Sequence, residues 1–133
     1  DKEQKRTFVH EVFHIMTRLI PALERAKENI AKAFVLELKK VHLDNKLRWH
    51  KQKLGKILSV STLDKETIKS IFAMNKGQIV RFFKAMSAEV KEEIFVETMA
   101  EFAFMSEADR MRNFPELDEV HTQVIACLQK ISS

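Results

Sequence analysis

The sequence predicts an all-α protein, a single antiparallel bundle of about five helices formed by residues 1–133. Only two glycines and two prolines occur in the chain, so few positions interrupt a helix. Apolar residues recur three and four positions apart along most of its length, whereas no segment alternates with the period of two that is typical of a strand.

Two long helices are expected in the first half of the chain. From Phe8 to Val41 the apolar residues form one helical stripe. Pro21 lies inside this stripe and lacks a backbone donor, so we expect a kink or break near Leu19.

We expect a turn at residues 42–45 between the first long helix and the second. The second helix carries the apolar stripe from Leu43 to Leu58. Its end is left open, because Ser61–Asp64 resembles a capping box whereas helical spacing continues to Met74.

Shorter helices are expected in the second half. Asn75–Gly77 is typical of a helix end, since Asn and Gly tolerate the left-handed conformation. Ile79–Met86 follows as a short helix or a loop. Ser87 and Ser106 are expected to cap the next two helices, and Pro115 is expected to begin the last one.

The composition fits a globular domain with an anionic partner. Apolar residues make up 45% of the chain and charged residues 32%, and no apolar run approaches the roughly 18 to 20 residues that a membrane span needs. The chain opens without a start methionine or an apolar signal core, so we expect a mature or trimmed form. A net charge of +4 favours phospholipid headgroups, acidic glycoproteins or nucleic acid.

Charge is sorted unevenly along the chain. Seven bases and one acid lie between residues 39 and 56, whereas ten acids and three bases lie between residues 89 and 119. Trp49 and the bases around it also suit a nucleic-acid face, but the acidic second half would repel phosphate, so we expect no nucleic-acid partner. We expect the bases to form a cationic helix face that attracts anionic lipid headgroups: Lys39, Lys40, Lys46, Arg48, Lys51, Lys53 and Lys56.

Two Phe-rich segments carry more apolar residues than one helix face can bury. Such residues usually pack in the core. However, Arg81 and Lys84 flank the first segment, as basic residues do in helices that lie in a bilayer interface. The residues expected to contact a membrane or a partner are Ile79, Val80, Phe82, Phe83, Phe102, Phe104 and Met105.

Two metal-site patterns are present. His10, Glu11 and His14 match the HExxH pattern of zinc peptidases, but such a peptidase also needs a third ligand and an edge strand. A di-iron site would pair Glu11 and His14 with Asp118 and His121, although that pattern prefers glutamate to Asp118. We expect no catalytic residues, no dedicated metal site and no cofactor, with weak metal binding by the two histidines as the alternative to an enzyme.

The order and spacing of five landmarks resemble those of the abalone sperm acrosomal proteins, the family of lysin and its fusagenic paralogue. The resemblance covers roughly residues 8 to 124. Its landmarks are Phe8-Val9-His10, Ala73-Met74-Asn75-Lys76, Met99-Ala100-Glu101-Phe102, Pro115 and the acidic segment Glu116-Leu117-Asp118-Glu119-Val120.

The resemblance implies a secreted, five-helix, non-enzymatic protein released from the sperm acrosome. Lysin binds glycoproteins of the egg vitelline envelope stoichiometrically, whereas its paralogue acts on membranes as a fusagen. This chain has a modest charge, an acidic last third and no tyrosine, which favours the membrane-active paralogue. We therefore expect a protein that destabilises membranes in sperm–egg fusion. A lysin-like binder of an egg-coat glycoprotein and a helical adaptor remain the alternatives, and homodimer formation through the apolar surface is left open.

Overall fold

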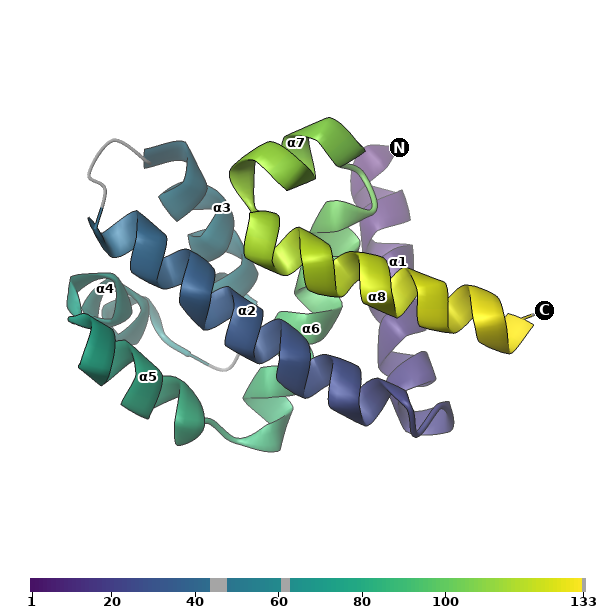
Figure 1. The fold of residues 1–133 in the computed structure, drawn as a ribbon, viewed down its shortest axis with the longest axis horizontal. Helices are drawn as coiled ribbons and strands as arrows, with labels where there is room; N and C mark the ends of the chain where they lie inside the picture. Colours follow the sequence, from purple (N-terminus) through teal and green to yellow (C-terminus); the bar gives the residue numbers. More distant parts are fainter. Residues whose placement is uncertain (44–47, 61–62, 133) are drawn as a thin grey trace.

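The structure, a computed structural model, describes residues 1–43, 48–60 and 63–132, apart from the side chains of residues 42–43 and 48–49. These residues contain eight helices and no strand, which confirms the predicted helical bundle with more helices than the expected number of about five (Figure 1). The helices are α1 (Lys2–Leu19), α2 (Leu23–Leu43), α3 (Arg48–Ser59), α4 (Lys65–Ala73), α5 (Lys76–Lys84), α6 (Ala88–Phe102), α7 (Glu107–Asn113) and α8 (Pro115–Ser132).

The break predicted near Leu19 is confirmed, and it divides the first apolar stripe into α1 and α2. Helix α1 ends at Leu19, and Ile20 is extended, with φ −119° and ψ 99°. The amide of Leu23 donates to the carbonyl of Ile20 at 3.0 Å, which closes a tight turn around Pro21. Because Pro21 cannot donate a backbone hydrogen bond, the two helices change direction there.

A helix ends at Ala73, close to the helix end predicted at Asn75–Gly77, but Asn75 itself begins the next helix and the predicted left-handed conformation is wrong. The φ of Asn75 is −75°, its side chain accepts from the amide of Gln78 at 2.9 Å, and the Gln78 side chain accepts from the amide of Asn75 at 3.0 Å. This capping box satisfies amides that the first turn of α5 leaves free. Asp64 caps α4 by accepting from the amide of Thr67 at 2.7 Å, whereas Ser61 lies outside the described residues.

The other predicted helix starts are confirmed. The Ser87 hydroxyl accepts from the amide of Val90 at 3.2 Å at the start of α6, and the Ser106 hydroxyl accepts from Asp109 at 3.1 Å at the start of α7. Pro115 is the first residue of α8. All three starts are local features of the chain, which is why sequence reasoning found them.

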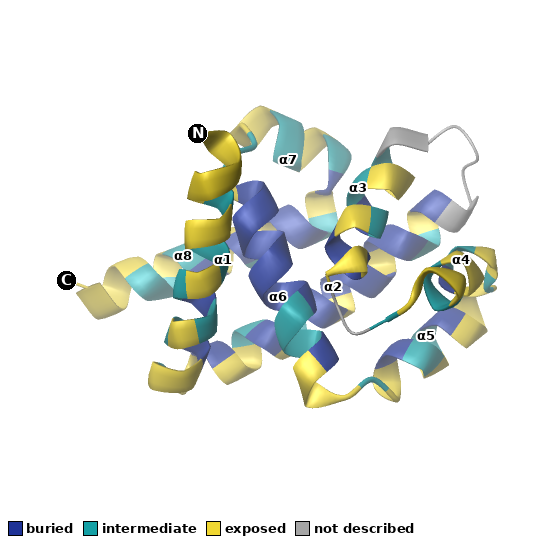
Figure 2. Ribbon diagram, turned by 180° about the vertical axis from the view of Figure 1, so that it is seen from behind, coloured by how far each residue is buried: buried dark blue, intermediate teal, exposed yellow. Residues whose placement is uncertain are grey.

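Helix α6 runs through the centre of the bundle. Every residue from Ile94 to Phe102 is buried (Figure 2). Helices α1, α2 and α3 pack against α6, and α8 packs along α2. The rings of Phe13 and Phe95 meet edge to face at 5.9 Å between centroids, which joins α1 to α6 in the core.

A buried carboxylate on α2 caps α8 from outside that helix. Oε1 of Glu37 accepts from the amides of Glu116 and Leu117 at 2.7 and 3.2 Å. Burial raises the pKa of Glu37, and it outweighs these amides and the charge of Lys40, which lower that pKa. Glu37 therefore attaches the start of α8 to the middle of α2.

We predict that Glu37→Ala lowers the free energy of unfolding by about 1–2 kcal/mol, because two amides of α8 lose their acceptor. Glu37→Gln keeps an oxygen that can accept and should lose less. Urea denaturation of both variants measures the difference, and equal losses would contradict the capping role.

His121 of α8 is buried beside an ion pair. Its ring packs edge to face on Phe102 at 5.3 Å between centroids, and Arg110 binds Asp118 at 2.9 Å nearby. Burial, followed by the charge of Arg110, lowers the pKa of His121 to about 4, against the opposing effect of Asp118. The ring is therefore neutral in the folded protein at neutral pH.

The stability of the protein should fall as the pH falls through the window between the two pKa values of His121, 6.5 unfolded and about 4 folded. In this window the unfolded chain binds a proton that the folded chain does not, which removes up to about 3 kcal/mol. Urea denaturation at several pH values should show a shallower decline for His121→Gln than for the parent. Identical declines in the two proteins would be inconsistent with this assignment.

Candidate functional site

Three of the apolar residues predicted to contact a membrane lie in the core. Ile79, Phe83 and Phe102 are exposed by only 1%, 4% and 1%, so the prediction is wrong for them. Helix α5 turns Ile79 and Phe83 inward onto α2, where the ring of Phe83 lies 5.7 Å from that of Phe34. Phe102 is buried because it belongs to the central helix α6.

The other four predicted contact residues are half-buried. Val80, Phe82 and Met105 pack against the core with part of their surface outside it, and Phe104 has intermediate exposure. The Phe-rich segments therefore contribute mainly to packing and leave only a small apolar surface.

The predicted cationic face is partly neutralised within the molecule. Lys53 and Lys56 of α3 both bind the carboxylate of Glu101 on α6, at 3.2 and 3.1 Å. Burial acts to raise the pKa of Glu101, but the two lysines lower it by more, so this carboxylate is held ionised. Lys46 and the side chain of Arg48 lie outside the described residues.

The remaining described lysines of this set are spread over the surface. Lys40 binds Glu116 at 3.3 Å, and the amine of Lys51 lies 5.3 Å from the centroid of the Phe72 ring. Lys39 is half-buried. The described members of this set therefore do not form a continuous track of free cations, because Glu101 and Glu116 pair with three of them. The sequence alone could not reveal which acids the fold brings to these lysines.

Three large exposed apolar side chains and the half-buried Val12 form a stripe along α1, which we call the α1 stripe: Phe8, Val12, Ile15 and Leu19. Phe8, Ile15 and Leu19 are exposed by 69%, 55% and 73%, and Val12 is half-buried. Their spacing of four, three and four places them on one side of the helix. Exposed residues recur along all of α1 (Figure 2). None of the described helices is long and apolar enough to span a bilayer.

The inward face of α1 is polar, which explains why its apolar stripe lies outside. Arg6, His10, His14 and Thr17 share this face and meet a row of glutamates on α6. An amphipathic helix ordinarily buries its apolar side. Helix α1 instead buries its charged side, with Phe13 as its main apolar contact with the core.

His14 lies between two of the α6 glutamates. Its Nδ1 is 2.9 Å from Glu92 and its Nε2 is 2.9 Å from Glu93, and the Thr17 hydroxyl donates to Glu92 at 3.1 Å. Burial acts to raise the pKa of Glu92, but the hydrogen bonds from His14 and Thr17 and the charge of Lys27 lower it by more. The Glu92 carboxylate is thus ionised in the folded protein at neutral pH.

The other end of this interface holds a fully buried carboxylate. Glu97 forms an ion pair with Arg6, which also donates to Glu101 at 3.0 Å. His10 lies next along α1, with its Nε2 3.5 Å from Glu93 and 3.6 Å from Glu97. Basic side chains of α1 therefore compensate charges that α6 carries into the interior.

A third potential metal ligand, which the sequence analysis missed, lies beside the two histidines of the HExxH pattern. Glu93 joins His10 and His14, whereas Asp118 binds Arg110 and is not part of this cluster. The four-residue spacing of Glu93, Glu97 and Glu101, among the apolar residues that follow Glu93, was the available signal. Glu11 is exposed and approaches Nδ1 of His10 at 3.3 Å, on the opposite side of the ring from Nε2.

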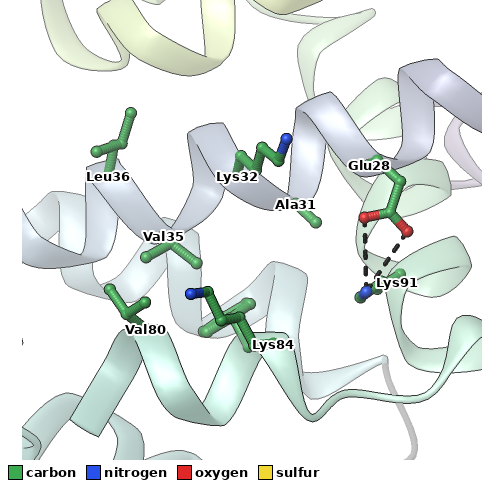
Figure 3. A pocket seen from close by; sticks show the side chains of 9 residues that line it. Glu28, Ala31, Lys32, Val35, Leu36, Val80, Lys84 and Lys91 are labelled. Atoms are coloured by element: carbon green, nitrogen blue, oxygen red, sulfur yellow. Dashed lines mark hydrogen bonds and ion pairs between the residues drawn. The ribbon is translucent and has the colours of Figure 1, made fainter. Parts of the chain in front are cut away.

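A second surface is a groove of about 260 Å³ between α2 and α5, which we call the lysine-rimmed groove. Val35 and Val80 face each other across it, with Lys84 beside them and the pair formed by Glu28 and Lys91 at its other end (Figure 3). The full lining is Glu28, Ala31, Lys32, Val35, Leu36, Val80, Phe83, Lys84 and Lys91. Within the described residues, Lys32 and Lys84 form no ion pair, so the rim carries unneutralised positive charge.

No protein-family model, curated protein or solved structure matches this chain. The functional interpretation of the α1 stripe and of the lysine-rimmed groove therefore rests on the chemistry of their side chains.

Phe83 and Phe8 should differ sharply in their effect on stability. Phe83→Ala leaves a cavity in the core and should cost about 3–5 kcal/mol, whereas Phe8→Ala, at an exposed position, should change stability by less than about 0.5 kcal/mol. Urea denaturation of the two variants measures this difference. Similar values would contradict the opposite burial of these two side chains.

Proposed function

We propose that this protein is a non-enzymatic, membrane-active protein that binds and destabilises anionic lipid surfaces, with the α1 stripe as its membrane contact. The observation that carries the proposal is the outward exposure of Phe8, Ile15 and Leu19 on one side of a helix. Large exposed apolar side chains in register mark contact with a membrane or another protein. A helix that lies in the bilayer interface buries such a side among the acyl chains.

The size of the α1 stripe suits reversible binding to a membrane surface. Full burial of one large apolar side chain contributes about 1.5–3 kcal/mol. Phe8, Ile15 and Leu19 already lose part of their surface to the fold, so together they would contribute about 3–6 kcal/mol. This range is sufficient for peripheral attachment and far below the insertion energy of a transmembrane helix.

The charges of α1 favour an anionic surface to a modest degree. Lys2, Lys5 and Arg18 are exposed on this helix, as are Glu3 and Glu11. Each basic residue near an anionic surface contributes up to about 1 kcal/mol. The whole chain has a net charge of +4, which adds a long-range attraction that salt should weaken.

The biological setting that we propose follows from the resemblance to the abalone sperm acrosomal proteins. Phe8 begins the first landmark of that resemblance and is also the first residue of the α1 stripe. We therefore infer a secreted protein of the sperm acrosomal vesicle that acts on membranes during sperm–egg fusion.

The lysine-rimmed groove favours a second candidate function, the binding of an acidic egg-coat glycoprotein in the manner of lysin. Lys32 and Lys84 offer free positive charge beside the apolar Val35 and Val80. Acidic groups next to apolar ones on a partner would complement this lining. In this second candidate, the α1 stripe serves contact with a partner protein or a second copy of the chain.

The test compares vesicle binding by two double variants. Phe8→Ser/Leu19→Ser removes two exposed apolar side chains and should weaken binding to anionic vesicles about a hundredfold, from a loss of about 3 kcal/mol. Met111→Ser/Ile131→Ser removes two exposed apolar side chains elsewhere and should bind as the parent does. Cosedimentation measures binding, and lipid mixing measures destabilisation.

A groove variant separates the two candidate functions. Lys32→Gln/Lys84→Gln should retain most vesicle binding if the α1 stripe is the membrane contact. Equal binding by the parent and the α1-stripe variant would overturn the proposed contact. Failure of the parent to bind anionic vesicles at any salt concentration would overturn the membrane function and favour a protein partner or an adaptor role.

A further inference from the structure

A trio of potential metal ligands spans the interface between α1 and α6. His10 and His14 lie one turn apart on the inward face of α1, with their ring centroids 4.8 Å apart. Glu93 of α6 reaches both, with Oε1 2.9 Å from Nε2 of His14 and Oε2 3.5 Å from Nε2 of His10. Their ligand atoms all lie within 4.8 Å of one another.

The separations between Glu93 and the two histidines are close to the ligand spacing of a zinc site. Zinc binds imidazole nitrogen and carboxylate oxygen at about 2.0–2.1 Å in a tetrahedron, which places neighbouring ligand atoms about 3.3 Å apart. The two Glu93 contacts, 2.9 and 3.5 Å, lie on either side of that spacing. Small side-chain movements would therefore suffice to admit the ion.

Carboxylates orient both imidazole rings from behind. Nδ1 of His14 lies 2.9 Å from Glu92, and Nδ1 of His10 lies 3.3 Å from Glu11. A proton on each Nδ1 leaves the lone pair on Nε2, the nitrogen that faces Glu93. Histidine ligands of metals are commonly held in this way by a carboxylate on the second nitrogen.

Glu97 lies next along α6 and is the candidate for a fourth ligand, which a side-chain movement would have to bring to the trio. It is fully buried, and its Oε2 lies 3.6 Å from Nε2 of His10. Oε2 has no hydrogen-bond donor within the described part of the chain, whereas Oε1 faces Arg6. A buried carboxylate oxygen without a donor is costly unless a cation occupies the space before it.

Solvent can reach this position. His14 and Glu93 line a cavity of about 370 Å³ that opens to the surface. The cavity gives an ion a path to the ligands, which a buried metal site requires.

We propose that His10, His14 and Glu93 bind a Zn²⁺ ion, with Glu97 as the fourth ligand, and that this ion joins α1 to α6. Two histidines with two carboxylates are a donor set that suits zinc. A site with four protein ligands is closed and therefore structural. Glu11 is bound to Nδ1 of His10, which makes it an orienting residue and not a base positioned above the metal.

The decisive comparison is between two isosteric variants of α6. Glu93→Gln removes the bridging carboxylate, whereas Glu89→Gln makes the same charge change at an exposed position one turn earlier. Calorimetric titration of the metal-free, full-length protein with Zn²⁺ should give one site per chain. Glu93→Gln should weaken Zn²⁺ affinity at least tenfold, and Glu89→Gln should leave it unchanged.

The melting temperature provides a second measurement of Zn²⁺ binding that does not depend on the calorimetric titration. Zn²⁺ should raise the melting temperature of the parent and of Glu89→Gln in a concentration-dependent way, and it should raise that of Glu93→Gln much less. Circular dichroism without metal shows whether each variant is folded. Unchanged affinity in Glu93→Gln would show that the histidine pair alone binds the ion, and this would overturn the site.

Absence of Zn²⁺ binding in the parent would also overturn the site. In that case the cluster is a set of polar contacts between the two histidines and Glu92 and Glu93, and it serves only the packing of α1 on α6. The vesicle experiments test a different face of α1, so failure of either proposal leaves the other standing.

Discussion

The bundle depends on the neutralisation of the carboxylates that α6 carries into its interior. Glu97 is fully buried and Glu101 nearly so, and Glu92 and Glu93 lie at the same interface. An unpaired charge in such a position costs several kcal/mol, so α6 can be central only if cations surround it. The compensating groups come from three helices: Arg6 and the imidazole rings of His10 and His14 from α1, Lys27 from α2, and Lys53 and Lys56 from α3.

This requirement decides the orientation of α1. Its polar face must meet α6, so the stripe that begins at Phe8 is left in solvent, although an isolated amphipathic helix would be expected to bury it. The same orientation brings His10 and His14 against Glu93. The surface that we propose for membrane contact and the site that we propose for zinc are thus opposite faces of one helix, and both result from one electrostatic constraint.

The uneven distribution of charge along the chain has its main consequence inside the molecule. The basic segment between residues 39 and 56 and the acidic segment after residue 89 look like two separate surfaces when they are read in order. In the fold, Glu101 binds Lys53 and Lys56, so part of each segment cancels the other. Unpaired positive charge remains outside the basic segment, for example at Lys32 and Lys84 beside the groove.

The sequence by itself determined the helices and most of their ends. The scarcity of glycine and proline, the break at Pro21 and the caps at Ser87 and Ser106 act within a few residues, so no distant contact is needed to predict them. Asn75 shows the limit of this reasoning, because its side chain can end one helix or begin another, and the neighbouring Gln78 decided the outcome. The tertiary structure alone decided which face of each helix is buried. That choice depends on the partner helix, and for α1 the partner presents carboxylates, which pair with Arg6 and the histidines and leave the α1 stripe on the outside.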